Sequence, residues 1–248
     1  MKRPVIGVTG ITSTSNGHVV YPHSQYYCQA VLDHGAMPMT IPAFVTEEEA
    51  LRYLEHVDAM IFIGGPDIPP HFYGEEPHET VCPLREDIAS AHLALVKAVL
   101  ASDFPFLGVC LGCQELCVGS GGKLIQHLDD LTPRHKNSYV DEEKGNRPDT
   151  YHFVEVESGT LLEDLFGSRR IRVNSCHHQA VNPAFPCDRF KITSYSTEDG
   201  VVESIERQDR EFGLGVQWHP ERYFDRDQTA MSLFAAFVEA SKVFSEKK

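Results

Sequence analysis

Short apolar runs alternate with amphipathic segments through the first half of the chain. The runs PVIGVT, AMPMTI and DAMIFIGG have strand length, and the segments between them, SQYYCQAVLDHG and TEEEALRYLEHV, space their apolar residues as a helix does. A T-x-x-E capping box at Thr46 and Glu49, and Gly35 where a helix C-terminus is expected, agree with these boundaries. The order predicts βαβ units around a parallel sheet.

The same alternation continues toward the middle of the chain. Residues 84–100 have a helical pattern, FPFLGV (104–109) has the length of a strand, and LGCQELCVGSGG (111–122) predicts a helix that ends in glycines. The strand is apolar on both faces, as a central strand of a parallel sheet is. We therefore predict an α/β fold with a mostly parallel central sheet.

The second half of the chain is predicted to be rich in strands. From Leu124 to Thr150 the periodic pattern gives way to a polar stretch that is long for a connection inside a compact domain. After it come the strand-like runs YHFVEVE, RIRVNS, RFKITSYS, VVESIE and FGLGVQWH, and then a closing helix over about residues 227–244. Neither an internal repeat nor a linker divides the sequence, so we expect a single domain over residues 1–248.

Composition and charge exclude several classes of partner. The chain has 42% apolar residues, and its 22 Lys and Arg stand against 36 Asp and Glu, for a formal charge of −14. Nucleic acid and anionic membrane are therefore not expected partners. The N-terminal apolar stretch is too short for a signal sequence, no run has membrane-spanning length, and the seven cysteines suit reduced thiols better than a disulfide framework. These features predict a cytoplasmic protein.

Cys110 lies where the buried strand turns into the next helix, within G-x-C-x-G. This is the arrangement of a nucleophile elbow, in which glycines two residues away on either side avoid collisions at a tight turn. The start of the following helix favours the thiolate, which is the reactive form. Two alternatives stay open: a buried structural cysteine between glycines that permit close packing, and a C-x-x-C redox pair of Cys110 and Cys113 with Cys117 behind it.

A nucleophilic thiol needs a base and a group that orients the base. Near the end of the chain, Pro220 favours extended geometry at His219, and in an extended segment His219 and Glu221 project to the same side. The carboxylate can then accept from one imidazole nitrogen and leave the other for Cys110. The alternative is a histidine at the edge of the sheet followed by a surface glutamate.

Backbone N–H groups are the expected stabilisers of an oxyanion. Leu111, directly after Cys110, supplies one. The loop IFIGGPDIPP follows another strand of the sheet and ends at the same carboxyl edge, where Gly65 is the favoured second donor. A tight turn that requires positive φ at Gly65 is the alternative explanation of that glycine.

The chain resembles a known superfamily through four motifs, which are, in chain order, GGPDIPPHFYGE, GVCLGCQEL, VNSCHHQAV and GLGVQWHPE. It resembles the class I glutamine amidotransferase-like superfamily, and within it the gamma-glutamyl-gamma-aminobutyrate hydrolase group. The resemblance covers nearly the whole chain. It implies a flavodoxin-like α/β/α sandwich and a Cys–His–Glu triad of Cys110, His219 and Glu221.

The resemblance also implies substrate-binding positions. Gln114 matches the glutamine that holds the glutamyl end of the substrate, and the strand segment beside that end corresponds to Asn174, Ser175 and Cys176. His178 and Gln179 complete the pattern N-S-x-H-x-Q, and His178 is expected to line the cleft or to be part of a structural turn. The pair His177–His178 lacks a second pair of ligands at suitable spacing, so no metal site is expected. Cys113 departs from the larger residue that many relatives carry.

The expected function is hydrolysis of the γ-glutamyl amide bond of a small γ-glutamyl amine, similar to gamma-glutamyl-gamma-aminobutyrate, through a γ-glutamyl thioester. This chemistry needs no metal or organic cofactor. Two alternatives remain: a glutaminase component that supplies ammonia to a separate synthase partner, and a non-catalytic binding domain on the same fold. The sequence leaves the amine half of the substrate and the oligomeric state open, a homodimer included.

Overall fold

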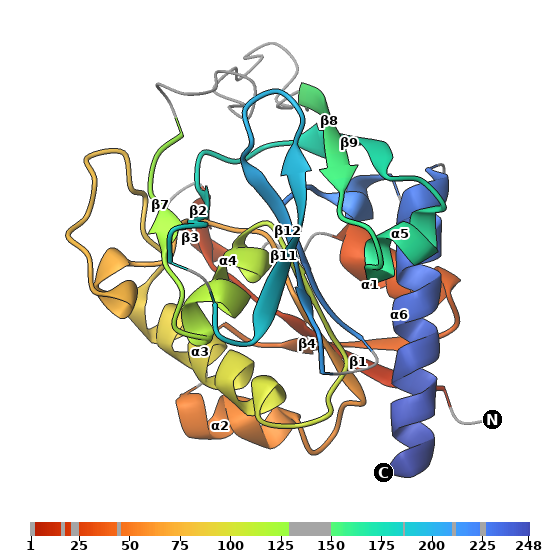
Figure 1. Ribbon diagram of the computed structural model, residues 1–248. Coiled ribbons are helices and arrows are strands. Elements are labelled where there is room, and N and C mark those ends of the chain that lie inside the picture. The colour runs from red at the N-terminus through yellow and green to blue at the C-terminus, as the bar shows by residue number, and fades with distance from the viewer. Residues whose placement is uncertain are drawn as a thin grey trace.

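A computed structural model of the chain describes residues 3–15, 18–20, 25–43, 46–128, 150–185, 187–209, 212–223 and 227–248, with only the backbone of residues 13–15 and 18–20. One large sheet runs through this part of the molecule (Figure 1). Its nine strands lie in the order β4-β1-β5-β6-β13-β12-β11-β8-β9. Their bounds are Met37–Ile41 (β4), Val5–Thr9 (β1), Ala59–Phe62 (β5), Phe106–Val109 (β6), Gly213–Val216 (β13), Val202–Arg207 (β12), Phe190–Ser196 (β11), Thr150–Val156 (β8) and Arg170–Ser175 (β9).

The remaining elements are helices and two small sheets. The helices are α1 (Gln25–Asp33), α2 (Glu47–Tyr53), α3 (Glu86–Leu100), α4 (Leu111–Gly119), α5 (Leu161–Phe166) and α6 (Gln228–Lys247), with the 3₁₀ helices η1 (Pro70–Tyr73) and η2 (Pro220–Arg222). The small sheets pair β2 (Ser13–Ser15) with β3 (His18–Val20) and β7 (Leu124–Ile125) with β10 (Ala180–Val181). The capping box of Thr46 and Glu49 is present at the start of α2, and Gly35 follows α1 with a φ of 86°.

The large sheet has a parallel half and an antiparallel half. β4, β1, β5, β6 and β13 pair in parallel, and β12, β11, β8 and β9 continue the sheet with antiparallel pairings. β13, the last strand in the chain, lies between β6 and β12 and so joins the two halves. The predicted α/β fold with parallel βαβ units is confirmed, and the antiparallel strands form an extension at one side.

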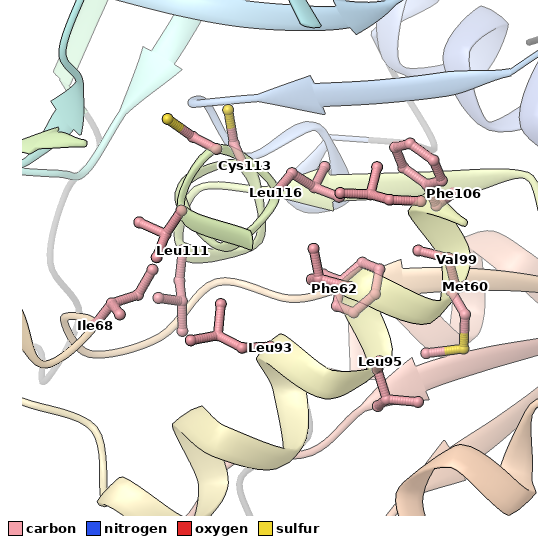
Figure 2. Close-up of a cluster of buried hydrophobic side chains, with 14 of the residues drawn as sticks. Met60, Phe62, Ile68, Leu93, Leu95, Val99, Phe106, Leu111, Cys113 and Leu116 are labelled. Atoms are coloured by element: carbon pink, nitrogen blue, oxygen red, sulfur yellow. The ribbon is translucent and has the colours of Figure 1, made fainter. Parts of the chain in front are cut away.

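Helices cover both faces of the parallel half. One buried cluster joins α2, α3 and α4 to one face, and a second joins α1, α5 and α6 to the other. Figure 2 shows the first cluster, in which Leu111, Cys113 and Leu116 of α4 lie above Phe62 of β5, with side chains of α3 on the far side. The strands between the two layers, β1, β5, β6 and β13, are buried along their whole length, as the apolar runs predict.

This arrangement places the candidate residues at one edge of the sheet. β5, β6 and β13 run in parallel, so the segments that follow them, at Gly64, Cys110 and Gln217, leave the sheet at the same edge. Ligands of open α/β sheets bind outside this carboxyl edge. Of the polar stretch between Leu124 and Thr150, residues 129–149 lie outside the described residues. Among the helices that are described, none is long and apolar enough to cross a membrane.

Candidate functional site

Cys110 occupies a strained turn between β6 and α4. β6 ends at Val109 and α4 begins at Leu111, and Cys110 between them has a φ of 52° and a ψ of −104°. Among the described residues it is the only non-glycine residue with positive φ. The side chain is 7% exposed. A strained backbone of this kind persists only where the surrounding structure holds it, and it is frequent at functional sites.

Glycines on both sides of Cys110 allow strand and helix to meet closely. A Cβ atom at Gly108 would lie 2.6 Å from the carbonyl oxygen of Gly112. A Cβ atom at Gly112 would collide with the backbone carbonyl of Phe62 in β5. Neither contact can be relieved by turning a side chain, because both involve backbone atoms. The turn therefore requires both glycines, as the sequence pattern predicts.

Replacing Gly112 by alanine should destabilise the fold despite the higher helix propensity of alanine. The added methyl group must push α4 away from β5, so we expect a loss of about 3 kcal/mol in the free energy of unfolding. Urea denaturation measures it. A variant as stable as the wild type would contradict the close approach of α4 to Phe62.

His219 and Glu221 form a buried pair at the end of β13. The Nδ1 atom of His219 lies 2.8 Å from Oε1 of Glu221, and the two side chains are 8% and 3% exposed. The prediction that residues 219–221 form an extended segment is wrong, because Pro220–Arg222 form the 3₁₀ helix η2. His219, with a φ of −111° and a ψ of 79°, directly precedes this helix. The contact therefore arises from a tight turn. The alternative of a surface glutamate is excluded by the burial of Glu221.

Charges around His219 favour its protonated form. Burial by itself lowers the pKa of His219, but the Glu221 carboxylate, which hydrogen-bonds the imidazole, and the nearby sulfur of Cys110 outweigh burial and raise the pKa to about 10. A neighbouring negative charge stabilises a cation most strongly where water is excluded. Cys110 lies far from His219 and Glu221 in the sequence, and the fold brings the three side chains into one interacting group.

Tyr27 of α1 is a fourth member that sequence reasoning missed. Its hydroxyl accepts a hydrogen bond from the Gly64 N–H at 3.1 Å and interacts with the charge of the nearby Glu221 carboxylate. Burial, followed by the charge of Glu221, raises the pKa of Tyr27 well above its ordinary value, so the phenol keeps its proton and can donate. The helix over α1 was predicted, but its sequence carries no signal that Tyr27 faces the end of β13.

Two backbone N–H groups near Cys110 remain for a ligand. Cys110, Gly112 and Gly64 donate to Val216, Ile63 and Tyr27, respectively. No acceptor is found among the described residues for the N–H of Leu111 or Gly65, and a Cβ atom at Gly65 would touch the Leu111 side chain at 2.8 Å. Gly65 is absent from the glycines with positive φ, so the alternative of a turn that needs positive φ there is wrong.

The residues expected to hold a glutamyl group surround this centre in part. Asn174, at the end of β9, accepts a hydrogen bond from the His219 N–H at its Oδ1 atom, 3.1 Å away. Ser175 is buried in the pairing of β9 with β8, and Cys176 is a half-buried free thiol. The Nε2 atom of Gln114 lies 3.2 Å from the Gln179 carbonyl and 3.3 Å from Oε1 of Gln217, so this amide is held within the core.

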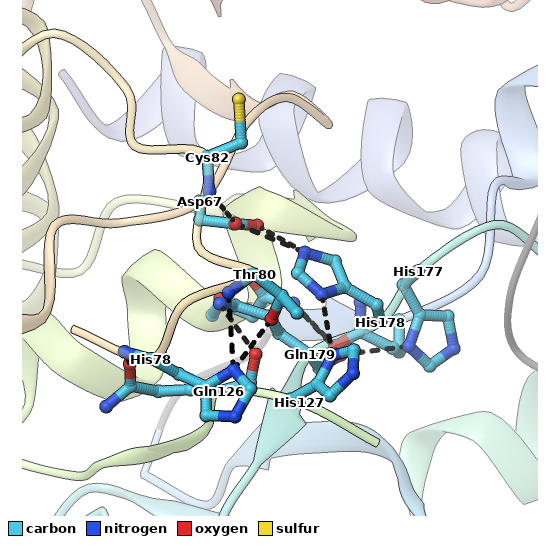
Figure 3. A network of polar contacts seen from close by, with 11 residues as sticks. Asp67, His78, Thr80, Cys82, Gln126, His127, His177, His178 and Gln179 are labelled. Carbon is cyan, nitrogen blue, oxygen red and sulfur yellow. Dashed lines mark hydrogen bonds and ion pairs between the residues drawn. The ribbon is translucent and has the colours of Figure 1, made fainter. Parts of the chain in front are cut away.

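The adjacent residues His177 and His178 contact different carboxylates. His178 Nε2 lies 3.0 Å from Oδ1 of Asp67, in the loop after β5, and the close-up in Figure 3 shows this pair. The His177 ring contacts Glu203 of β12 at 3.7 Å. Glu203 is buried; ion pairing with His152 and His177 outweighs that burial and lowers its pKa to about 2. In the part of the chain that the structure describes, no group of three or more His, Cys, Asp or Glu is arranged to hold a metal ion.

Cys113 differs from Cys110 in its surroundings. It is 1% exposed and lies under β13, where a Cβ atom at Gly215 would come within 2.9 Å of its Sγ atom. Burial raises the pKa of the Cys113 thiol well above its ordinary value. A thiol in such surroundings reacts slowly. The burial and the raised pKa of Cys113 therefore argue against a C-x-x-C redox pair of Cys110 and Cys113.

Comparison with known proteins places the chain in a family. The model of the family Peptidase C26 matches residues 4–221. The chain belongs to the Peptidase C26 family. Protein NtpR of Enterococcus hirae is 36% identical over 95% of this chain and 98% of its own length. Gamma-glutamyl-gamma-aminobutyrate hydrolase PuuD of Escherichia coli (strain K12) is 31% identical over 97% of this chain and 94% of its own length.

Solved structures agree on the fold. A putative GMP synthase subunit from Thermoplasma acidophilum superposes with a TM-score of 0.64 at 18% identity, over 100% of this chain and 98% of that one. The glutaminase domain of Trypanosoma brucei CTPS superposes with a TM-score of 0.62 at 16% identity, over 97% and 94% of the two chains. The Peptidase C26 chain thus has the flavodoxin-like fold of the class I glutamine amidotransferase-like superfamily, which confirms the resemblance, and it is a hydrolase.

Proposed function

We propose that the protein cleaves the γ-glutamyl amide bond of a small γ-glutamyl amine through a thioester on Cys110. The observation that carries the proposal is the interacting group of Cys110, His219 and Glu221, with the Cys110 sulfur on the strained turn and the imidazole held protonated beside it. The relatedness to gamma-glutamyl-gamma-aminobutyrate hydrolases supports the choice of substrate class.

The reaction begins with the Cys110 sulfur beside the protonated imidazole of His219. The Cys110 thiolate attacks the γ-carbonyl carbon, and the N–H groups of Leu111 and Gly65 stabilise the oxyanion that forms. His219 then donates its proton to the departing amine nitrogen, the C–N bond breaks, and a γ-glutamyl thioester remains. Glu221 keeps the imidazole ring oriented and stabilises its positive charge.

The second half of the reaction uses the same groups in reverse. Neutral His219 removes a proton from water, and the resulting hydroxide attacks the thioester carbonyl. Collapse of the tetrahedral intermediate breaks the C–S bond, releases glutamate and restores the thiolate beside the imidazolium. The glutamyl group would lie between Gln114 and the segment Asn174 to Cys176, with His178 at the border of the cleft. No step needs a metal or an organic cofactor.

A substrate panel tests the proposed function. Gamma-glutamyl-gamma-aminobutyrate and other γ-glutamyl amines, glutamine, and an α-linked glutamyl dipeptide are each offered to the protein, and released glutamate and amine are quantified. We expect kcat/KM for at least one larger γ-glutamyl amine to exceed that for glutamine by 10-fold or more, as an order of magnitude, and no cleavage of the α-linked dipeptide.

The other outcomes separate the alternatives. A preference for glutamine would favour a glutaminase that supplies ammonia to a synthase partner. The absence of any turnover, with folded protein and each substrate in excess, would contradict the proposal and favour a binding domain. Cleavage of the α-linked dipeptide would contradict the assignment of the γ-glutamyl group.

Replacing Tyr27 by phenylalanine should lower activity without unfolding the protein. The variant loses the hydroxyl that accepts from the Gly64 N–H and lies beside Glu221, so the loop at Gly64 and the carboxylate are held less firmly around His219. We expect kcat/KM to fall about 10-fold, mainly through kcat, because positioned hydrogen bonds act on the transition state. Tyr26→Phe is the matched control, since Tyr26 is 46% exposed on the same helix. Equal activity of the two variants would contradict the role of Tyr27.

A further inference from the structure

A second pair of thiols lies on the helix that begins at Cys110. Cys117, near the end of α4, has its Sγ atom 2.9 Å from the Sγ atom of Cys187, which precedes β11. The two residues are 70 positions apart in the sequence. Cys117 is 0% and Cys187 is 5% exposed, and both are free thiols. The mechanism proposed for Cys110 uses neither of them.

The chain makes room for this sulfur pair at Gly122. A Cβ atom at Gly122 would lie 2.5 Å from the sulfur of Cys117 and 2.8 Å from that of Cys187. The Gly122 N–H also donates to the Cys117 carbonyl oxygen at 3.0 Å, so the chain folds back over the pair as it leaves α4. A larger residue at this position would separate the sulfur atoms, and only glycine leaves them in contact.

The two thiols differ in how readily they lose a proton. Contact with Cys117 lowers the pKa of Cys187, although burial opposes the effect. Contact with Cys187 and burial raise the pKa of Cys117. Cys187 is 5% exposed and Cys117 is 0% exposed, so Cys187 is the sulfur that a small oxidant reaches first, and Cys117 is the thiol placed to react with it.

We propose that Cys117 and Cys187 form a reversible disulfide when the protein meets a hydroperoxide, as a thiol modification site separate from Cys110. The Cys187 thiolate attacks the peroxide oxygen, the O–O bond breaks, and a sulfenic acid and one water (or alcohol) result. The Cys117 sulfur then attacks the sulfenic sulfur, an S–S bond forms, and a second water leaves with the thiol proton. The peroxide gains the two electrons that the sulfurs lose, and a dithiol reductant reverses the reaction.

The positions of Cys117 and Cys187 determine what a disulfide between them would change. The sulfur atoms must approach from 2.9 Å to about 2.0 Å, which is a small displacement. The bond would close a loop of 70 residues and raise the midpoint of thermal unfolding by on the order of 10 °C. Cys117 lies about 10 Å along α4 from Cys110, so the cross-link is expected to leave the catalytic thiol free.

Oxidation in the Cys110→Ser variant tests the proposal without interference from the catalytic thiol. The full chain is treated with a small excess of hydrogen peroxide, alkylated without reduction and digested with trypsin. The peptides 98–123 and 173–189 carry the pair, but they also contain Cys113 and Cys176. Fragment spectra of the cross-linked peptide must therefore assign the bond. We expect two thiols per chain to be lost, a 117–187 bond, and full recovery with dithiothreitol.

Cys113→Ser is the matched control, because Cys113 is buried on the same helix and lies in the same tryptic peptide. The 117–187 bond should form in Cys113→Ser and should be absent in Cys187→Ser. Oxidation should raise the midpoint of thermal unfolding in Cys113→Ser but not in Cys187→Ser. Alkylation of both Cys117 and Cys187 after peroxide treatment would overturn the proposal. A bond from Cys187 to Cys113, or a bond that dithiothreitol does not reduce, would overturn it as well.

Discussion

Cys110→Ser is expected to abolish hydrolysis of γ-glutamyl amides while the protein stays folded. A serine hydroxyl fits the strained turn that the cysteine occupies, but at neutral pH it does not ionise beside His219 as a thiol can. The attack on the γ-carbonyl then lacks its nucleophile, and we expect kcat to fall by on the order of 10³-fold or more. Release of glutamate from a γ-glutamyl amine measures the loss, and circular dichroism verifies the fold.

Cys113→Ser provides the control for this result. Cys113 is also buried on α4, but its thiol lies under β13 and takes no part in the proposed reaction. We expect kcat/KM within about 10-fold of the wild type for this variant, with some loss of stability from the buried hydroxyl. Comparable inactivation of both variants would contradict the triad and favour a dithiol site.

Glu221→Gln is expected to have the second largest effect, and it should change the pH dependence as well as the rate. The carboxylate of Glu221 is the strongest of the influences that hold the pKa of His219 at about 10 against burial. Without it the imidazolium loses its proton at lower pH, and the ring is no longer fixed by the 2.8 Å contact. We expect kcat to drop by about 10²- to 10⁴-fold, and the alkaline limb of kcat/KM to move from near pH 10 toward neutral pH.

The same pair contributes to stability in a defined pH range. The pKa of His219 in the folded protein is raised from 6.5 to about 10, so its stabilising contribution is complete below about pH 6.5 and is lost as the pH rises through 10. The difference in unfolding free energy between the wild type and Glu221→Gln should therefore shrink toward pH 10. Glu239→Gln, at an exposed position on α6, controls for loss of a carboxylate in general. An alkaline limb that does not move in Glu221→Gln would contradict the assignment.

Much of the parallel half of the fold could be predicted because its signals are local. The capping box at Thr46, the glycine after α1 and the apolar strands each follow from neighbouring residues. The turn at Cys110 is similar: glycines at 108 and 112 are required by backbone contacts within the strand–helix unit and with the adjacent strand β5. Constraints of this kind can be recognised from a short stretch of sequence.

Features that depend on long-range packing could not be predicted in the same way. The individual runs of the second half indicate strands, but nothing in them indicates that β13 lies between β6 and β12 and joins an antiparallel extension to the parallel half. The contact of His219 with Glu221 was predicted for the wrong reason, since η2 and not an extended segment brings them together. The hydroxyl of Tyr27 lies near the Glu221 carboxylate because α1 packs beside η2.

The partners of the two adjacent histidines show the same limit. His177 and His178 are adjacent in the sequence, but in the fold the His177 ring contacts Glu203 of β12 and the His178 ring contacts Asp67 after β5. These carboxylates are distant in the sequence and carry no spacing pattern that would link them to the histidines. The segment after β9 meets the loop after β5 and the start of β12, and this packing brings His178 to Asp67 and His177 to Glu203.

Stoichiometric labelling by a diazoketone analogue of glutamine tests the central claim most directly, because the analogue presents an electrophilic carbon where the γ-carbonyl of a substrate would lie. The account predicts one label per chain, on Cys110 in peptide 98–123, with activity lost in proportion to labelling, no label in Cys110→Ser and normal labelling in Cys113→Ser. Label on another cysteine with loss of activity, or hydrolysis that persists after Cys110 is fully labelled, would contradict it.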